Sequence, residues 1–274
     1  MLHLQNQVYT GSDERQSLFD LHIPANFNGK TIVFVHGFMG FKDWGTWHLM
    51  EAYFIEKGFG FAKLNLTHNG GTIENGIDFP DEAAFGNNTY SKELKDIQFA
   101  LSSIEILLIK EALPIDFQLM GHSRGGGMIL LAGATYPSVS KLISLAPISS
   151  IATRFPNGEA LDKWKSSGVR YIENGRTKQQ LPMYYSLYED FKENEDLLDI
   201  EKCCKQLKKP LLVLHGTNDS SVKIEEGQQV AKWSNATFVS IENADHVFGT
   251  SHPWTKKELP TQLRIVCEFV KEFI

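Results

Sequence analysis

The stretch GHSRG, residues 121–125, decides the fold of this chain. An apolar run, Ile115–Met120, comes directly before it, and a helical pattern, Gly125–Tyr136, follows it. A G-x-S-x-G segment between a strand and a helix is typical of a nucleophile elbow, a sharp turn that lifts a serine hydroxyl above the end of a sheet. Larger side chains two residues before and after the serine would clash in so tight a turn, which explains both glycines. We therefore predict that Ser123 is a nucleophile.

Short apolar runs alternate with helical patterns on both sides of this elbow, which predicts an α/β fold with a mostly parallel, eight-stranded sheet flanked by helices. The expected buried strands are Thr31–Val35, Phe59–Leu66, Ile115–Met120, Lys141–Ala146, Pro210–His215 and Ala236–Ile241. Two earlier runs predict antiparallel edge strands, at Leu2–Tyr9 and Ser17–Ile23. The expected helices are Trp47–Lys57, Ser91–Lys110, Gly125–Tyr136, Ile224–Ser234 and Pro260–Ile274.

One segment, 148–209, interrupts this alternation, because it is far longer than a crossover between two strands requires. We expect it to be a cap, inserted after the sixth strand into a core made of residues 1–147 and 210–274. A hairpin is predicted over Val169–Gln180, turning at an Asn-Gly pair at 174–175. The insert is rich in aromatic residues, of which Tyr171, Tyr184 and Tyr185 are predicted to bind substrate. The alternative is a crossover connection that carries extra secondary structure and has no role in substrate binding.

A serine hydroxyl needs a base to take its proton, and this base must come from a loop at the same edge of the sheet. Among nine histidines, His246 has the best position because it follows the last strand, and His252 is the alternative. Asp219 follows the preceding strand and is predicted to orient the imidazole, although turn formation alone would also explain an Asp there. Asp245 is a weaker candidate, since adjacent side chains seldom face each other in an extended loop. The order Ser123, Asp219, His246 is the one associated with this elbow.

Acyl transfer also requires hydrogen-bond donors for an oxyanion. One predicted donor is the backbone N–H of Arg124, directly after the nucleophile. The other is the backbone N–H of Phe38 in the loop HGFMG, residues 36–40, where flanking glycines let the backbone approach a substrate. His36 in this loop is expected to brace it rather than to take part in catalysis.

Composition and missing motifs exclude several other classes of function. With 42% hydrophobic and 22% charged residues, the composition predicts a globular chain, and a net charge of −6 does not suggest a surface that binds nucleic acid. No apolar run is long enough for a membrane span, and residues 1–16 lack the basic and apolar pattern of a secretory signal, so neither is expected. Three cysteines, Cys203, Cys204 and Cys267, predict reduced thiols and a cytoplasmic location. No zinc, P-loop or dinucleotide motif is present, so neither metal nor cofactor is expected. A monomer and a homodimer remain equally open.

Taken together, the motifs resemble those of serine hydrolases with the α/β-hydrolase fold, and among them the dienelactone-hydrolase-like and cinnamoyl (feruloyl) esterases. The likeness covers nearly the whole chain and is carried by HGFMG at 36–40, GHSRGG at 121–126, LHGTND at 214–219 and ADHVF at 244–248. It implies a triad of Ser123, His246 and Asp219, with the amides of Phe38 and Arg124 as the oxyanion hole. It also implies that the hairpin-bearing insert shapes an acyl or aryl pocket.

Two features depart from this resemblance. Dienelactone hydrolases proper use a cysteine as the nucleophile, whereas this chain has Ser123. The loop Thr67–Asn88, rich in glycine and asparagine, matches no motif of these families. The resemblance is therefore specific for the fold and leaves the substrate open.

The predicted function is the hydrolysis of a small carboxylic ester, with aryl or cinnamoyl esters as candidates, through an acyl-enzyme. A peptidase of the prolyl-oligopeptidase type or an acyltransferase would use the same groups. Such peptidases usually carry a large N-terminal domain, and here only residues 1–30 precede the first predicted core strand. A non-catalytic binding module is the third alternative, and it is disfavoured because every catalytic role has a chemically competent candidate.

Overall fold

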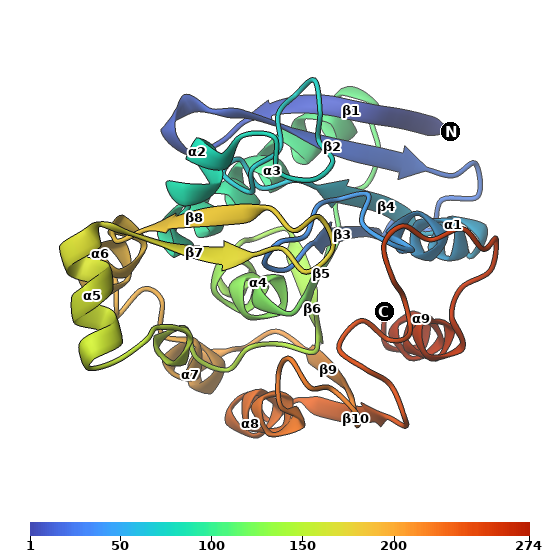
Figure 1. Ribbon diagram of the computed structural model, residues 1–274. Helices are drawn as coiled ribbons and strands as arrows, with labels where there is room; N and C mark the ends of the chain where they lie inside the picture. Colours follow the sequence, from blue (N-terminus) through green and yellow to red (C-terminus); the bar gives the residue numbers. More distant parts are fainter.

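The computed structural model describes all residues, 1–274, and centres on an eight-stranded sheet with the order β1-β2-β4-β3-β5-β6-β9-β10 (Figure 1). Its strands are β1 (Leu2–Thr10), β2 (Gln16–Ile23), β3 (Thr31–Val35), β4 (Gly60–Leu64), β5 (Phe117–His122), β6 (Val139–Leu145), β9 (Leu211–Gly216) and β10 (Thr237–Ile241). All pairings from β4 to β10 are parallel, which confirms the predicted mostly parallel sheet. The two N-terminal strands are antiparallel as predicted. Of these two, only β1 lies at an edge of the sheet, because β2 also pairs with β4.

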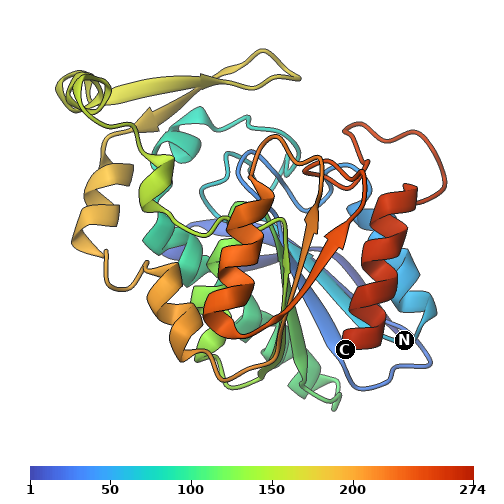
Figure 2. The ribbon, with the colours of Figure 1, turned by 90° about the horizontal axis from the view of Figure 1, so that it is seen from below.

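Helices cover both faces of the sheet. Figure 2 shows α1 and α9 on one side of the strands and most of the other helices on the opposite side. The helices are α1 (Trp47–Glu56), α2 (Glu82–Gly86), α3 (Tyr90–Lys110), α4 (Arg124–Ala134), α5 (Glu159–Ser167), α6 (Ser186–Glu193), α7 (Ile200–Gln206), α8 (Ile224–Ser234) and α9 (Thr261–Phe273). None of them combines the length and the apolar composition that crossing a bilayer requires.

Alternating side chains of the buried strands supply two hydrophobic cores, one on each face of the sheet. Ile32 and Phe34 of β3 belong to the core under α1 and α9, whereas Val33 and Val35 belong to the larger core under α3 and α4. One face of α3 packs into that larger core, where Leu94, Ile97, Leu101, Ile104 and Leu108 are buried at the spacing of three and four residues that a helix face requires. Because these strands are parallel, their carboxyl ends lie at one common edge of the sheet.

The segment 148–209 contains the predicted hairpin and three helices, α5, α6 and α7. The sequence pattern did not predict α5 and α6, whereas α7 is the helix expected to carry Cys203 and Cys204 before Pro210. Strands β7 (Val169–Glu173) and β8 (Gln180–Tyr184) form a separate antiparallel sheet, which lies outside the main sheet in Figure 2. The predicted hairpin ended at Gln180, where the second strand in fact begins. The reason is that Asn174 Oδ1 accepts hydrogen bonds from the N–H groups of Arg176 (3.0 Å) and Thr177 (3.2 Å), which opens the turn into a six-residue loop, 174–179.

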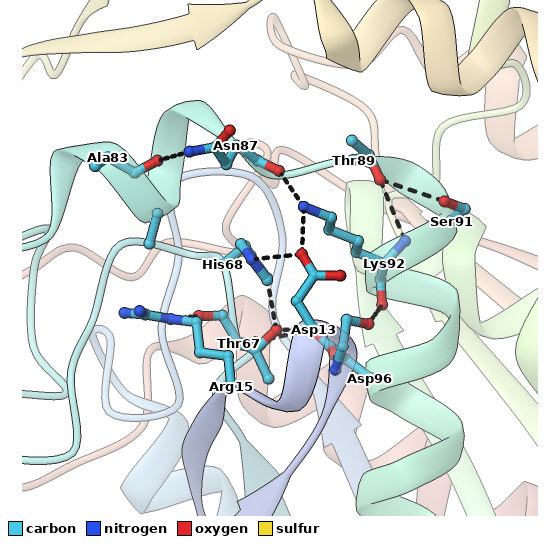
Figure 3. Close-up of polar contacts among 12 residues, drawn as sticks. Asp13, Arg15, Thr67, His68, Ala83, Asn87, Thr89, Ser91, Lys92 and Asp96 are labelled. Carbon is cyan, nitrogen blue, oxygen red and sulfur yellow. Dashed lines mark hydrogen bonds and ion pairs between the residues drawn. The ribbon is translucent and has the colours of Figure 1, made fainter.

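A polar network, buried around Thr67 and Asp96, explains how the loop Thr67–Asn88 is held in place (Figure 3). Thr67 donates to Asp96 of α3 through both its N–H (2.8 Å) and its hydroxyl (2.7 Å). Arg15 Nε donates to the Thr67 carbonyl (2.7 Å), and His68 Nε2 lies 3.4 Å from the Asp13 carboxylate, which also accepts from Lys92 (2.7 Å). The start of the loop is therefore tied both to the turn between β1 and β2 and to α3.

Candidate active site

Ser123 occupies a strained turn between β5 and α4. Its φ of 57° and ψ of −119° are unfavourable for a residue with a side chain and present its hydroxyl beyond the strand end. A Cβ on Gly121 would lie 2.4 Å from the carbonyl oxygen of Gly125, and a Cβ on Gly125 would lie 2.3 Å from that of His36. No larger residue fits at either position, so the structure has the elbow geometry that the sequence predicts.

Three side chains from the loops after β5, β9 and β10 form a continuous chain of hydrogen bonds. Ser123 Oγ lies 2.9 Å from His246 Nε2, and His246 Nδ1 lies 2.7 Å from Asp219 Oδ2. The alternative candidates have other partners. His252 Nδ1 accepts from the N–H of Gly45 (2.9 Å), and the Asp245 carboxylate accepts from the N–H groups of its own turn, at Val247 (3.2 Å) and Gly249 (2.8 Å).

The carboxylate of Asp219 is completely buried and fully hydrogen-bonded. Its Oδ1 accepts from the N–H groups of Ser221 (2.8 Å) and Val222 (2.9 Å), while Oδ2 faces both His246 and His215. Burial alone would raise the pKa of Asp219, but the hydrogen bonds from His215, His246 and the Val222 amide outweigh it and hold the pKa well below its usual value. Asp219 is therefore an anion that orients His246 at neutral pH.

His215 is a component of this site that sequence reasoning missed. Its Nε2 lies 3.1 Å from Asp219 Oδ2 and 2.9 Å from the Val222 carbonyl oxygen, so the proton of a neutral ring belongs on Nε2. Its Nδ1 is buried without a partner, and a Cβ on Gly227 would lie only 2.5 Å from it. The signal in the sequence was its position at the end of a buried strand, four residues before Asp219.

Two further histidines brace the loops around Ser123 in their uncharged form. His122 Nε2 donates to the carbonyl oxygen of His246 (2.8 Å), and burial, reinforced by the neighbouring His246, lowers the pKa of His122 to about 3. His36 donates from Nδ1 to the Gly37 carbonyl (2.8 Å) and accepts the Leu66 N–H on Nε2 (3.3 Å), and burial lowers its pKa to about 4. His36 thus braces its loop, as expected from the sequence.

Two backbone N–H groups beside Ser123 are free to bind a ligand. The N–H of Phe38 has no hydrogen-bond partner in the chain, and Arg124 is the first residue of α4, where an N–H has no acceptor within the helix. The side chain of Arg124 joins the two segments, because its guanidinium lies 4.0 Å from the Phe38 ring centre and 4.7 Å from that of Tyr90. Its Nη1 also donates to buried Glu93 (3.1 Å). This side-chain contact had no signal in the sequence.

A cavity of about 270 Å³ opens at Ser123. Its walls are mainly aromatic and include Phe38, Phe41, Trp44, Trp47, Phe79 and His252. The hairpin contributes only its tip, through Asn174 and Arg176. An ion pair of Arg176 with Asp78 and a hydrogen bond from Gln179 to the Phe79 carbonyl (2.9 Å) hold this tip against the loop 67–88.

The three tyrosines predicted to bind substrate do not line this cavity. Tyr171 alternates outward along β7 and is 62% exposed. Tyr184 packs against Gly86 of α2, and Tyr185 lies against Trp164 with ring centres 5.5 Å apart. The prediction expected the aromatic residues of the insert to surround the substrate. In the structure Tyr184 lies against α2, Tyr185 lies against the insert itself, and Tyr171 is exposed to solvent.

Several solved structures share this architecture. Est1E from Butyrivibrio proteoclasticus, solved with bound ferulic acid, superimposes with a TM-score of 0.72 at 22% identity over 97% of each chain. The esterase domain of a Rhodothermus marinus protein superimposes with a TM-score of 0.65 at 15% identity, covering 100% of this chain and 98% of its own. The acylaminoacyl peptidase of Pyrococcus horikoshii gives 0.66 at 17% identity, covering 98% of this chain but 40% of its own.

These likenesses show that the chain has the α/β-hydrolase fold, as its motifs predict. No family model matches the sequence, and no curated protein is detectably similar to it in sequence. The chemistry of the site must therefore be argued from its own geometry.

Proposed function

We propose that this protein hydrolyses carboxylic esters through an acyl-enzyme on Ser123. The observation that carries the proposal is the unbroken chain of hydrogen bonds from Ser123 through His246 to Asp219, at 2.9 and 2.7 Å. These distances suit direct proton transfer from the hydroxyl to the imidazole, and the buried anion stabilises the imidazolium that results.

In this reaction Ser123 Oγ attacks the ester carbonyl carbon while His246 Nε2 takes the hydroxyl proton. The N–H groups of Phe38 and Arg124 stabilise the oxyanion of the tetrahedral intermediate. His246 then returns the proton to the leaving alcohol oxygen, and the acyl group stays on Ser123. A water molecule, deprotonated by His246, attacks the acyl-enzyme and releases the carboxylic acid. No step requires a cofactor.

The aromatic walls of the cavity favour an ester with an aryl or cinnamoyl acyl group. Rings of Phe41, Trp44 and Phe79 offer apolar contact to a planar group, and a volume of about 270 Å³ suits one small acyl chain. The structural likeness to Est1E with bound ferulic acid agrees with this choice. We also propose that residues 148–209 act as the cap of a core formed by 1–147 and 210–274, with the hairpin tip over the substrate.

A peptidase of the prolyl-oligopeptidase type is the second candidate, because the fold likeness to the acylaminoacyl peptidase extends over 98% of this chain. An acyltransferase would use the same acyl-enzyme with an acceptor other than water. The three free cysteines, and a pKa of the Cys204 thiol raised to about 12 by burial, agree with the proposed cytoplasmic location and with inert thiols.

Two experiments test these proposals. A fluorophosphonate probe should label the wild-type protein and leave Ser123→Ala unlabelled, and the substitution should lower kcat by several orders of magnitude while the protein stays folded. A panel of methyl ferulate, p-nitrophenyl acetate and an aminoacyl amide then separates the substrate classes. Hydrolysis of both esters with a preference for methyl ferulate supports the proposal. A preference for the amide supports the peptidase, and equal labelling of Ser123→Ala would overturn the assignment of the nucleophile.

A further inference from the structure

Away from the cavity at Ser123, three side chains of types that bind metal ions lie in a separate hollow of about 600 Å³ between β1, β2 and α1. His3 and His22 face each other across the two antiparallel strands, and their rings stack with centres 4.3 Å apart at an angle of 16°. Glu51 reaches toward them from α1, with Oε1 3.4 Å from His22 Nδ1. One ligand atom from each residue lies within 4.8 Å of the other two. This hollow and the cavity at Ser123 share no lining residue.

The charges around this group leave an excess of negative charge. Lys42 lies 2.9 Å from Asp20 and 2.5 Å from Asp43, and Lys63 contacts Asp20, Asp43 (2.8 Å) and Glu51 Oε2 (3.3 Å). Three carboxylates therefore face two ammonium groups, which gives a formal net charge of −1. Because Lys63 uses Oε2 of Glu51, the other carboxylate oxygen remains directed at His22. A bound cation would neutralise the cluster.

His3 and His22 each offer an imidazole nitrogen as a ligand, and imidazole is the commonest metal ligand among protein side chains. His3 is exposed, so its side chain is free to turn toward a shared ion.

We propose that His3, His22 and Glu51 bind one Zn²⁺ ion, with water completing its coordination. Two histidines and a carboxylate with an open position are a ligand set that zinc uses in proteins. Ligands about 2.0–2.1 Å from a tetrahedral ion lie about 3.3–3.4 Å apart, so the donor atoms need to approach one another by at most about 1.5 Å. Such an ion would link the N-terminal strand pair to α1. The sequence showed no zinc motif because the three ligands come from segments far apart in the chain.

The test is a zinc titration of the full-length protein after treatment with a chelator, followed by competition with a chromophoric zinc indicator. Wild-type protein should bind one equivalent, and its thermal unfolding midpoint should rise with zinc concentration. His22→Gln and Glu51→Gln should each weaken binding at least about tenfold, as loss of a ligand costs at least as much as loss of its supporting contacts. Replacing zinc by Co²⁺ should give the visible absorption bands of a tetrahedral site in the wild type, and these bands should be lost or weakened in His22→Gln and Glu51→Gln.

Matched control variants show whether these three side chains hold the ion. His48 lines the same hollow but is not one of the three ligands, so His48→Gln should bind zinc as the wild type does. Ser123→Ala should also bind normally, because the site does not depend on the proposed hydrolase activity. Absence of saturable one-to-one binding overturns the proposal. Equal affinity in wild type, His22→Gln and Glu51→Gln also overturns it, since the ion would then be held elsewhere. If one of these two variants fails to fold, the other carries the test.

Discussion

Replacing Arg124 by methionine removes a buried guanidinium but keeps the backbone N–H proposed for the oxyanion hole. Glu93 is 3% exposed at its side chain and loses a partner at 3.1 Å. Removing one member of a buried ion pair costs about 3–5 kcal/mol, and the stacking of the guanidinium on Phe38 and Tyr90 adds about 0.5–2 kcal/mol. Burial already raises the pKa of Glu93, so this carboxyl can take up a proton when Arg124 is removed. The loss of stability should therefore lie toward the lower end of the summed range. We expect the free energy of unfolding to fall by about 3–5 kcal/mol.

A double substitution separates stability from catalysis. In Arg124→Met with Glu93→Gln, no unpaired charge remains buried, and most of the lost stability should return. The ring of Phe38 still lacks the guanidinium that holds it, so its N–H is no longer fixed beside Ser123. Loss of one oxyanion donor costs about 10²–10³ in kcat, which sets the upper limit for misplacing one. We expect kcat to fall about 10- to 100-fold in both Arg124 variants.

The assay is steady-state hydrolysis of p-nitrophenyl acetate, with unfolding followed in guanidinium chloride. Glu93→Gln alone is the control, because Arg124 and its two ring contacts remain, and its kcat should stay within a few-fold of wild type. A loss confined to kcat, with KM little changed, is the result expected for a group that acts on the transition state. If the double variant regained both stability and kcat, Arg124 would have no positioning role.

Three other predictions concern the triad, the cap and acid stability. Asp219→Asn should lower kcat by about 10⁴-fold, because the amide favours the wrong imidazole tautomer, whereas Asp245→Asn should have a small effect; the reverse order in kinetic measurements would contradict the assignment. Replacing the loop 174–179 by a Gly-Ser linker should lower kcat/KM more for methyl ferulate than for p-nitrophenyl acetate. The difference should correspond to about 1–3 kcal/mol in activation free energy, with the fold checked by circular dichroism. Burial lowers the pKa values of His36 and His68 to about 4 and that of His122 to about 3, so the unfolded chain takes up three more protons than the folded one as the pH falls below about 6.5. Denaturant titrations at pH 7 and pH 5 should therefore show a loss of about 6 kcal/mol in the free energy of unfolding, at about 1.4 kcal/mol per pH unit for each histidine, and equal stability at the two pH values would contradict this.

The parts of the fold that were predictable depend on local constraints. Strands such as β3 and β9 are short apolar runs buried on both faces, so they are visible in the sequence without any knowledge of their neighbours. Gly121 and Gly125 are needed because carbonyl groups lie where their Cβ atoms would be, and this made Ser123 recognisable. Helices α5 and α6 have nine and eight residues, too few for a periodic pattern to distinguish them from loops.

The lining of the cavity was not predictable, because it depends on contacts between distant segments. The floor of the site comes from loops that directly follow β5, β9 and β10, and strand order alone brings them to one edge. The part of the cavity wall formed by the hairpin tip depends on the contacts of Arg176 with Asp78 and of Gln179 with Phe79. These pairs are separated by 98 and 100 residues in the sequence. No local pattern shows that the tip of the hairpin, rather than Tyr171 on its strand, reaches the cavity. It follows that substitutions in the hairpin tip or in the loop 67–88 can change which ester is accepted without altering the hydrogen bonds among Ser123, His246 and Asp219.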